Sequence, residues 1–297
     1  MNIDTSCFKA FQAAVKTLNF TEAARVAGMT QSGVSQHIAK LEKDLGVNLF
    51  LRVAKRIHLT DEGRVLNSYI DAHQDLMTSL VESLQDSTLS LRGQVRYSMP
   101  DSCLLSPHFG LLLKDKVDNF PAISLKVNLN HSEGVVEEVL SHGIDFGFVT
   151  KQIPNDALLY EDFCDEEYVL ITPRKMNWEL ADATDSRWIA YPGFVDIFGK
   201  WSAGQTKKNS KFSLSYSGET NGLKAALMMV SHGLGMTVLP RHCVESFEDK
   251  RNIKIQDEDS TALKNGIFII TLTENPHSKR VQKVIESFRT MKSEFPR

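Results

Sequence analysis

The sequence predicts an α/β protein with three parts: a small helical module, one long helix, and a larger body of strands and helices. Residues 1–60 contain short helical patterns separated by sharp breaks, and residues 61–91 continue as a single helix. Between residues 92 and 297, strand and helix patterns alternate, which is typical of α/β architecture. A chain of 297 residues is long enough for two or three such units.

The composition excludes several classes of protein. Hydrophobic residues make up 42% and charged residues 24%, which is ordinary for a globular protein. No stretch approaches the roughly 18 apolar residues of a membrane span, and the N-terminus lacks the features of a signal peptide. We therefore expect a cytoplasmic location and no membrane partner. The four cysteines form no CxxC pair, so we expect no metal site and no dithiol motif.

Charge is distributed unevenly along the chain. Residues 1–60 carry eight Lys or Arg against four Asp or Glu, a net charge of +4. Because the whole chain sums to −3, the other 237 residues carry −7. A basic module joined to an acidic body is typical of a polyanion-binding head, although charge alone does not identify the polyanion as DNA.

Capping residues divide the basic module into three helices. Thr21 is expected to cap a helix over residues 22–27 that ends at Gly28, and Thr30 to cap a helix that runs to about residue 45. The first helix is expected from apolar residues at helical spacing: Phe8, Phe11, Val15 and Leu18.

The start of the third helix presents short polar side chains opposite an apolar stripe. In a helix-turn-helix the second helix of the motif enters the major groove, where Gln can bond an adenine edge twice and Ser suits several bases. The alternative, a merely solvated polar face, stays open on these residues alone. The candidate base-reading residues are Thr30, Gln31, Ser32, Ser35 and Gln36.

Residues 48–59 follow as a predicted hairpin, or wing. Its basic residues Arg52, Lys55 and Arg56 suit contacts with phosphate or the minor groove, which set affinity more than sequence preference.

The long helix is expected to begin after a Thr60 cap, and its apolar seam suits pairing with a second copy of the chain. The alternative is packing on its own domain, and His73 is expected as a core imidazole. The seam residues are Leu66, Ile70, His73, Met77, Leu80 and Leu84.

The run NFTEAARVAGMTQSGVSQHIAKLEKDLGVNLFLRVAKRIHLT at residues 19–60, followed by Asp-Glu-Gly, resembles the DNA-binding domain of LysR-type transcriptional regulators. Leu18-Asn19 and Leu51 depart from the family pattern, at positions away from the reading face. The matching elements are Ala23-Ala24, Thr30-Gln31-Ser32, Val34-Ser35, Leu41-Glu42, Leu45-Gly46, Leu49-Phe50, Arg52, Leu59-Thr60 and Gly63.

The resemblance continues through Gly93-Gln94-Val95, Phe120-Pro121, Gly143-Ile144-Asp145 and Gly233-Leu234-Gly235. It implies an N-terminal all-α winged helix-turn-helix, a linker helix, and an effector-binding domain of two α/β subdomains resembling periplasmic binding proteins. Subdomain I is expected at about 92–155 and 266–297 and subdomain II at about 156–265, with crossovers near 151–159 and 262–266. The resemblance also implies a homodimer or homotetramer, and RNA polymerase as a partner.

By the same resemblance, a small-molecule effector meets the loop after the first strand of the body. Ser102 there is a candidate contact, although Asp101 beside it would disfavour an anion. Cys103, at a helix start, is a second candidate and also raises the alternative of a thiol sensor with a lowered pKa. Strand ends supply further candidates, each of which could instead be a plain helix cap: His131, Ser132, Thr150, Tyr191, Ser217 and Thr220.

No enzyme motif competes with this interpretation. The chain contains no GxSxG, P-loop, HExxH or GxGxxG pattern, so we expect neither catalysis nor a cofactor. The predicted function is a sequence-specific transcription regulator that binds double-stranded DNA and responds to a small molecule of unknown identity. A regulator that needs no ligand and has a degenerate cleft remains the alternative.

Overall fold

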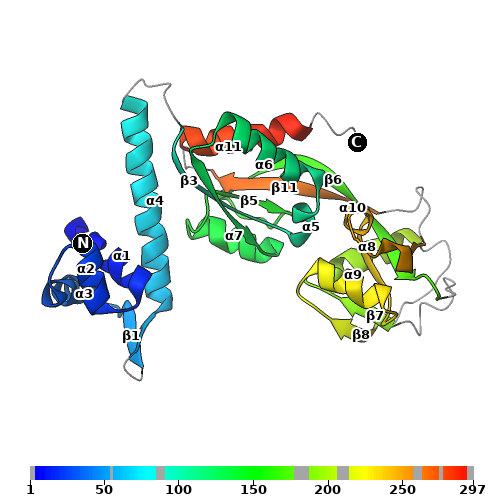
Figure 1. Cartoon of the computed structure of the whole chain (residues 1–297), viewed down its shortest axis with the longest axis horizontal. Helices are drawn as coiled ribbons and strands as arrows, with labels where there is room; N and C mark the ends of the chain where they lie inside the picture. Colours follow the sequence, from blue (N-terminus) through cyan, green and yellow to red (C-terminus); the bar gives the residue numbers. More distant parts are fainter. Residues whose placement is uncertain are drawn as a thin grey trace. The chain divides into compact units, whose positions relative to one another are not determined.

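The structure is a computed structural model that describes residues 4–53, 56–84, 91–176, 187–205, 214–256, 263–273 and 277–292. The chain forms two compact units (Figure 1). The first is Met1–Thr88 with Ser141–Gly143, and the second is Leu89–Leu140 with Ile144–Arg297. Each unit has its own core, and each is described by itself.

The first unit is a three-helix module with a hairpin and one long helix. Small side chains at the helix contacts, such as Ala23 and Ala24, allow close packing around Phe11 and Leu41, which are fully buried. The elements are η1 (Thr5–Cys7), α1 (Phe8–Thr17), α2 (Phe20–Ala27), α3 (Gln31–Leu45), β1 (Phe50–Val53), β2 (Arg56–Leu59) and α4 (Asp61–Leu84).

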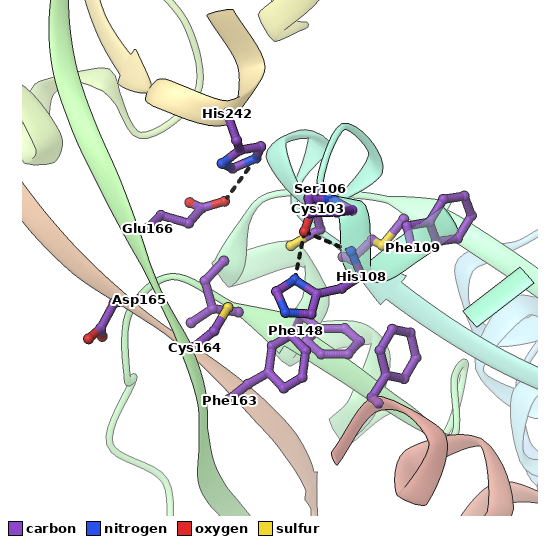
Figure 2. A pocket seen from close by; sticks show the side chains of 14 residues that line it. Cys103, Ser106, His108, Phe109, Phe148, Phe163, Cys164, Asp165, Glu166 and His242 are labelled. Carbon is purple, nitrogen blue, oxygen red and sulfur yellow. Dashed lines mark hydrogen bonds and ion pairs between the residues drawn. The ribbon is translucent and has the colours of Figure 1, made fainter. Parts of the chain in front are cut away.

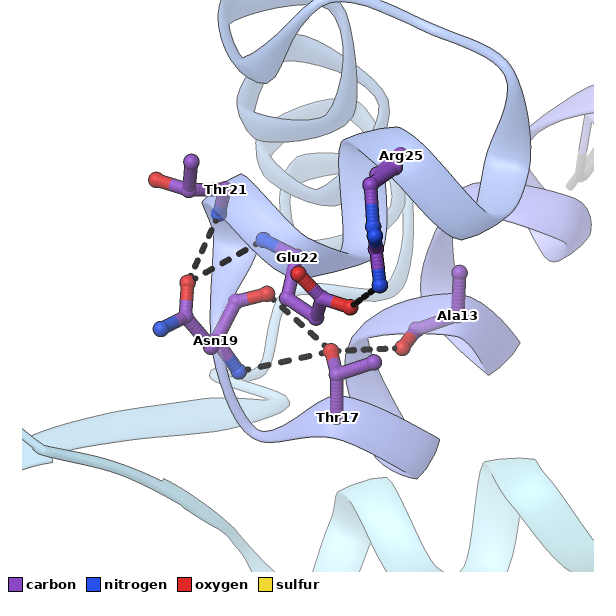
Figure 3. A network of polar contacts seen from close by, with 6 residues as sticks. All are labelled: Ala13, Thr17, Asn19, Thr21, Glu22 and Arg25. Carbon is purple, nitrogen blue, oxygen red and sulfur yellow. Dashed lines mark hydrogen bonds and ion pairs between the residues drawn. The ribbon is translucent and has the colours of Figure 1, made fainter.

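The second helix starts earlier than the sequence predicts, because Asn19 and not Thr21 is its cap (Figure 3). The Asn19 side-chain oxygen accepts hydrogen bonds from the backbone N–H groups of Thr21 at 2.9 Å and Glu22 at 3.2 Å. The Thr17 hydroxyl holds this turn by donating to the carbonyls of Ala13 and Asn19. Asn and Thr are both good caps, so the choice depended on the turn, in which Leu18 adopts a left-handed φ of 46°.

The third helix begins and ends where the sequence predicts. The Thr30 hydroxyl accepts a hydrogen bond from the Gly33 N–H at 3.1 Å, and Gly46 ends the helix with φ at 73°. Val34, Ile38 and Leu41 are buried, so the phase of the helix turns the polar residues of its first turns outward.

The predicted wing is a two-stranded antiparallel hairpin that is tied to the helices on both sides. The Glu42 carboxylate accepts hydrogen bonds from the N–H groups of Leu49 and Phe50, at 2.8 and 3.3 Å. Thr60 caps α4 by accepting from the Gly63 N–H at 2.9 Å and donating to the Asn48 carbonyl at 2.8 Å. A Cβ on Gly63 would overlap the Leu49 carbonyl oxygen, so only glycine fits there.

The start of α4 packs on its own unit. Ile70 is 1% exposed against the helical core, and the Gln12 amide of α1 bonds with Asp71 and Gln74. His73 was predicted as a core imidazole, but it is exposed and meets Phe8 edge-on at 6.4 Å between ring centroids. The side chains of the predicted seam residues Leu80 and Leu84 lie outside the described part of the chain.

The second unit contains a sheet of order β10-β6-β11-β5-β3-β4, with β9 also paired to β6. Its first half has β3 parallel to β4 and to β5, with α6 and α11 packed on one face of these strands and α7 on the other. These elements are β3 (Gly93–Met99), α6 (Pro107–Asn119), β4 (Ile123–Leu129), α7 (Ser132–Leu140), β5 (Phe146–Val149), β11 (Leu263–Leu272) and α11 (Lys279–Lys292).

The other half has a separate core around the fully buried Trp188 and Trp201. A bridge from Trp188 to Met236 joins the pair β7-β8 to the strand β9. This half contains β7 (Arg187–Ala190), α8 (Phe194–Gln205), β8 (Ser215–Glu219), α9 (Leu223–Ser231), β9 (Thr237–Pro240), α10 (Arg241–Glu245), η3 (Lys250–Asn252) and β10 (Ile253–Ile255).

Two long strands, β6 (Leu158–Pro173) and β11, join the halves (Figure 1). β6 pairs with β11 from Leu158 to Tyr168 and then with β9 and β10. The first crossover, predicted near 151–159, therefore lies further along the chain, inside β6. Charged residues in the middle of β6 hide the strand pattern.

The segment after β3 contains two helices with a break between them. The chain forms a short helix α5 (Asp101–Leu104), then a break, and α6 begins at Pro107 with Ser106 as its cap. Proline removes a helix donor but suits the first helical position, so the break falls directly before it.

Candidate DNA-binding surface and effector cleft

The predicted reading residues lie together on the first turns of α3. Gln31, Ser32 and Gln36 are exposed, and Ser35 is half-buried. The Gln31 amide lies 3.5 Å from the Ser35 hydroxyl, and the hydroxyls of Thr30 and Ser32 are 3.1 Å apart. Both contacts are local to the first turns of α3, and the side chains of Gln31, Ser32 and Gln36 face solvent.

The wing places Arg52 and Arg56 on its two strands. Arg52 pairs with Ile57, and Arg56 pairs with Val53. Their side chains, and the whole of Lys55, lie outside the described part of the chain, so their predicted contact with phosphate stays a prediction.

A cleft of about 1430 Å³ lies between the two halves of the second unit. Its lining comes from both halves, namely the loop after β3, the start of α7, the start of α8 and the start of α9. Five of the predicted effector residues line it: Ser102, His131, Ser132, Thr150 and Tyr191.

A chain of hydrogen bonds crosses the floor of the cleft. The Ser132 hydroxyl accepts from the Thr150 N–H at 3.0 Å. The Asn265 amide, on the crossing strand β11, donates to the Thr150 carbonyl at 3.0 Å and accepts from the Lys200 ammonium at 2.7 Å. Lys200 belongs to α8, so these hydrogen bonds connect the two halves of the unit.

Asp101 makes a direct bond across the cleft. Its carboxylate accepts a hydrogen bond from the Leu223 N–H at 2.6 Å, at the start of α9. The N-cap of α9 is Gly222, which offers no side-chain oxygen, so Asp101 serves as the cap from the opposite half. From the sequence, Asp101 was expected to disfavour an anion in the cleft. In the structure its carboxylate already occupies the N-terminus of α9.

Lys151 makes the second charged bond across the cleft. Its ammonium lies 2.6 Å from Glu133 in its own half and 3.0 Å from Asp196 on α8. The hydrogen bond from Lys151 lowers the pKa of Glu133, and the bonds to Glu133 and then Asp196 raise the pKa of Lys151. A salt bridge and a hydrogen bond therefore connect the two halves across the cleft.

Three predicted effector residues do not line the cleft. The Ser217 hydroxyl donates to the Trp188 carbonyl at 3.3 Å, and the Thr220 hydroxyl accepts from the Gly222 N–H at 3.3 Å. Both act as local turn and strand contacts, which was the alternative for strand-end polar residues. Cys103 lies behind the cleft, in a smaller inner cavity.

The thiol-sensor alternative loses its physical basis in this arrangement. Burial, the largest cause, raises the pKa of the Cys103 thiol well above its ordinary value, and the Glu166 carboxylate adds to this. Burial likewise raises the pKa of Cys243. A reactive cysteine needs a thiolate, so these environments oppose oxidation.

Sequence analysis missed Lys151, Asp196, Lys200 and the turn 221–223 as cleft residues. Lys151 directly follows Thr150 at a predicted strand end, so that position was within reach. The others depend on the placement of α8 and on the pairing of two distant helix starts.

Comparisons with known proteins agree with this architecture. The family model described as a bacterial regulatory helix-turn-helix protein of the lysR family matches residues 7–64. The model for the LysR substrate binding domain matches residues 90–292, more than half of the chain. The chain belongs to the LysR family. It is a LysR-type transcriptional regulator with a helix-turn-helix DNA-binding domain and an effector-binding domain.

Relatives cover nearly the full length of this regulator. The HTH-type transcriptional regulator YofA of Bacillus subtilis is 26% identical over 264 residues, covering 85% of this chain and 87% of the relative. ArgP from Mycobacterium tuberculosis has the same fold with a TM-score of 0.72 at 15% identity, covering 100% and 99%. CbnR, solved full-length with its target DNA, has a TM-score of 0.65 at 17% identity, covering 97% and 99%.

Among the described residues, no helix of this regulator combines the length and the apolar character needed to cross a membrane.

Proposed function

We propose that this LysR-type regulator reads its operator with the first turns of α3 and tunes transcription through a small molecule held in the cleft. The observation that carries the proposal is the exposed polar face of α3, in which Gln31, Ser32 and Gln36 stand outward over a buried apolar stripe. Such a face on the second helix of a helix-turn-helix is placed to bond base edges.

The remainder of the first unit supports DNA as the partner. Residues 1–60 carry a net charge of +4, and the wing contributes Arg52, Lys55 and Arg56. We propose that these wing residues contact the phosphate backbone or minor groove, and so supply affinity with little sequence preference. The solved structure of CbnR with its target DNA, a protein of the same fold, is consistent with this role.

We further propose that two copies pair through α4, so that two reading helices address the half-sites of a palindromic operator. Leu66 and Ile70 of the predicted seam pack on their own unit, so pairing cannot depend on them alone. Four other apolar side chains of α4 remain about half exposed and could form the contact with a second copy: Val65, Tyr69, Met77 and Val81. Pairing of the effector domains as well would give a tetramer.

The effector would act by changing the bonds that cross the cleft. Asp101 with Leu223, and Lys151 with Asp196, hold the two halves in the present arrangement. A ligand that replaces either bond favours another arrangement by the difference between its affinities for the two. We propose that this change reaches RNA polymerase or the bend of the operator, and that the protein catalyses no reaction.

The DNA-reading proposal is tested by a binding titration with the full-length protein on a duplex selected from a random-sequence library. Gln31→Ala is expected to weaken binding to the selected duplex by roughly tenfold, because one bidentate base contact contributes about 1–3 kcal/mol. Binding to a scrambled duplex should stay unchanged. Gln94→Ala, an exposed glutamine of the second unit, is the matched control. Equal affinities of Gln31→Ala and the parent protein would contradict the assignment.

The effector proposal is tested by thermal unfolding in the presence of metabolite pools of organic acids, amino acids and aromatic compounds. A ligand of the folded state raises the melting temperature. Ser132→Ala, in the cleft, should reduce that rise, whereas Ser217→Ala, outside it, should not. A failure of every pool to raise the melting temperature would favour the alternative of a regulator that needs no ligand.

A further inference from the structure

Three helices of the effector-binding domain begin at the cleft: α7 at Ser132, α8 at Phe194 and α9 at Leu223. The unpaired N–H groups and the dipole at such a helix start attract anions. Two of the three helices carry a carboxylate of their own in the first turn, namely Glu133 in α7 and Asp196 in α8. The first turn of α9 contains no acidic residue, so its own sequence leaves the charge at that helix start uncompensated.

Asp101 supplies the missing carboxylate from the other half of the domain. Its Oδ2 atom accepts the hydrogen bond from the Leu223 N–H at 2.6 Å, and the same atom lies 3.5 Å from where a Cβ on Gly222 would stand. A carboxylate ligand at this helix start would need the place that Asp101 occupies. The chain therefore fills the anion position of α9 with its own side chain.

The cations of the cleft are already engaged. The described residues that line it include three carboxylates but only two ammonium groups. The Lys151 ammonium lies 2.6 Å from Glu133 and 3.0 Å from Asp196. The Lys200 ammonium donates a hydrogen bond to the Asn265 amide oxygen at 2.7 Å. An anionic ligand would have to take one of these lysines from its present partners.

The Asp101 carboxylate still has room for a donor. A carboxylate can accept about four hydrogen bonds, and the Leu223 N–H uses one of them. In the described part of the chain, Asp101 Oδ1 has no hydrogen-bond donor and no ion-pair partner. Tyr191 also lines the cleft, and the face of an aromatic ring attracts cations. These features suit a ligand that brings an ammonium group.

The inner cavity behind the cleft offers an ammonium group no comparable partner among the described residues (Figure 2). Its wall is mostly apolar, and burial raises the pKa of Glu166, which favours the neutral carboxyl there. The Asp165 carboxylate points away from this cavity in Figure 2. A positively charged ligand is therefore expected in the cleft and not behind it.

We propose that Asp101 sets the charge of the effector: it fills the anion position at the start of α9, and it makes the cleft a site for an organic cation that carries an ammonium group and no carboxylate. The ammonium group binds Asp101 at Oδ1, while Oδ2 continues to cap α9. This inference rests on the proposed function, since it names the ligand class of the same cleft.

The anion position is tested by chemical rescue in thermal unfolding of the full-length protein. Asp101→Ala vacates the position, so sodium acetate should raise the melting temperature of this variant in a saturable way, compared with sodium chloride at equal ionic strength. The parent protein and Asp118→Ala, which loses an exposed carboxylate of α6, should show no such rise. Equal responses of Asp101→Ala and the parent to acetate would overturn the assignment.

The ligand class is tested by titration calorimetry on the parent protein with three probes of equal chain length: butylammonium, butyrate and butanol. Butylammonium is expected to bind at least tenfold more tightly than butyrate, because it gains a charged hydrogen bond where butyrate meets a like charge. Tighter binding of butyrate, or no binding of butylammonium at high millimolar concentration, would overturn the ligand class.

Asp101→Asn separates the charge of this residue from its capping role. Asparagine caps helices about as well as aspartate, so the melting temperature should stay close to that of the parent. The affinity for butylammonium should fall roughly tenfold, and the affinity for butanol should stay the same. Unchanged binding of butylammonium would show that Asp101 does not hold the cation.

These results distinguish a failure of this inference from a failure of the proposed function. An organic acid that raises the melting temperature of the parent, when butylammonium does not, would refute the cationic ligand class and leave the effector cleft in place. If no metabolite pool stabilises the parent, the response of Asp101→Ala to acetate still decides whether Asp101 fills an anion position.

Discussion

The proposed reading face of α3 and the effector cleft both carry polar side chains, yet they are built in opposite ways. The polar residues of α3 lie within a few positions of one another, and they bond mainly among themselves. The polar residues of the cleft come from distant segments and bond across it, as Asp101 does with Leu223, 122 positions away. The polar groups of α3 are therefore arranged by one helix alone, whereas those of the cleft connect two halves of a domain.

In the DNA-binding unit, the wing and α4 meet at a close backbone contact between Gly63 and Leu49. Gly63→Ala should destabilise the protein by about 1–3 kcal/mol or more, because the new Cβ would overlap the Leu49 carbonyl where the wing meets α4. Denaturant unfolding of the full-length protein measures this. Gly110→Ala, at an open helical position of α6, is the matched control and should be neutral or stabilising. A Gly63→Ala protein as stable as the control would show that this junction yields.

In the effector-binding domain, the arrangement of the two halves depends on bonds across the cleft. Asp101→Ala should lower the melting temperature of the effector domain, with a loss of about 0.5–2 kcal/mol, because α9 loses its cap. Asp118→Ala, an exposed carboxylate of α6, serves as the control in thermal unfolding. An unchanged melting temperature for Asp101→Ala would mean that the bond across the cleft adds no net stability.

The buried carboxyl of Glu166 predicts that the stability of the protein depends on pH. Burial raises the pKa of Glu166 above its ordinary value of 4.5, so the folded protein holds this proton more tightly than the unfolded chain. The contribution is therefore full below pH 4.5 and is lost as the pH rises through the raised pKa. Relative to the parent protein, Glu166→Gln should gain stability as the pH increases above 4.5. Unfolding curves at several pH values check the sign, and a parallel pair of profiles would contradict it.

The smallest expected effect concerns the turn before α2. Leu18 is 47% exposed and has a left-handed φ of 46°, a conformation that costs an L-residue about 1–2 kcal/mol. Leu18→Gly removes this strain but gives the unfolded chain more freedom, so a net gain of about 0.5 kcal/mol is expected. Denaturant unfolding would detect it. A net loss would indicate that the Leu18 side chain contributes packing that its exposure does not suggest.

The sequence predicted features that depend on neighbouring residues better than features that depend on contacts between distant segments. Thr30 and Gly46 were identified as the ends of α3 because a cap bonds within three or four residues of itself. Asn19 was missed because two capping residues stand close together and only the turn at Leu18 selects between them. The first crossover was placed too early because the charged middle segment of β6 pairs with β11, far away in sequence.

The candidate sites show the same division. The reading residues share one helix, so their common face follows from helical period alone. Ser102, Ser132 and Thr150 were correctly placed at the cleft because strand ends of an α/β unit gather at one edge. Ser217 and Thr220 satisfy the same rule, but local bonds hold them outside the lining.

The sequence by itself determined the module of short helices, its charge, the phase of α3 and the LysR resemblance, because each is written in neighbouring residues. Tertiary structure alone decided which groups meet across the cleft and which enclose the inner cavity. Asp101 caps a helix of the other half, and Asn265 of β11 bonds with Lys200 of α8, through contacts between segments that are far apart in the sequence. No local pattern encodes such a pair, since Asp101 alone is an ordinary acidic side chain.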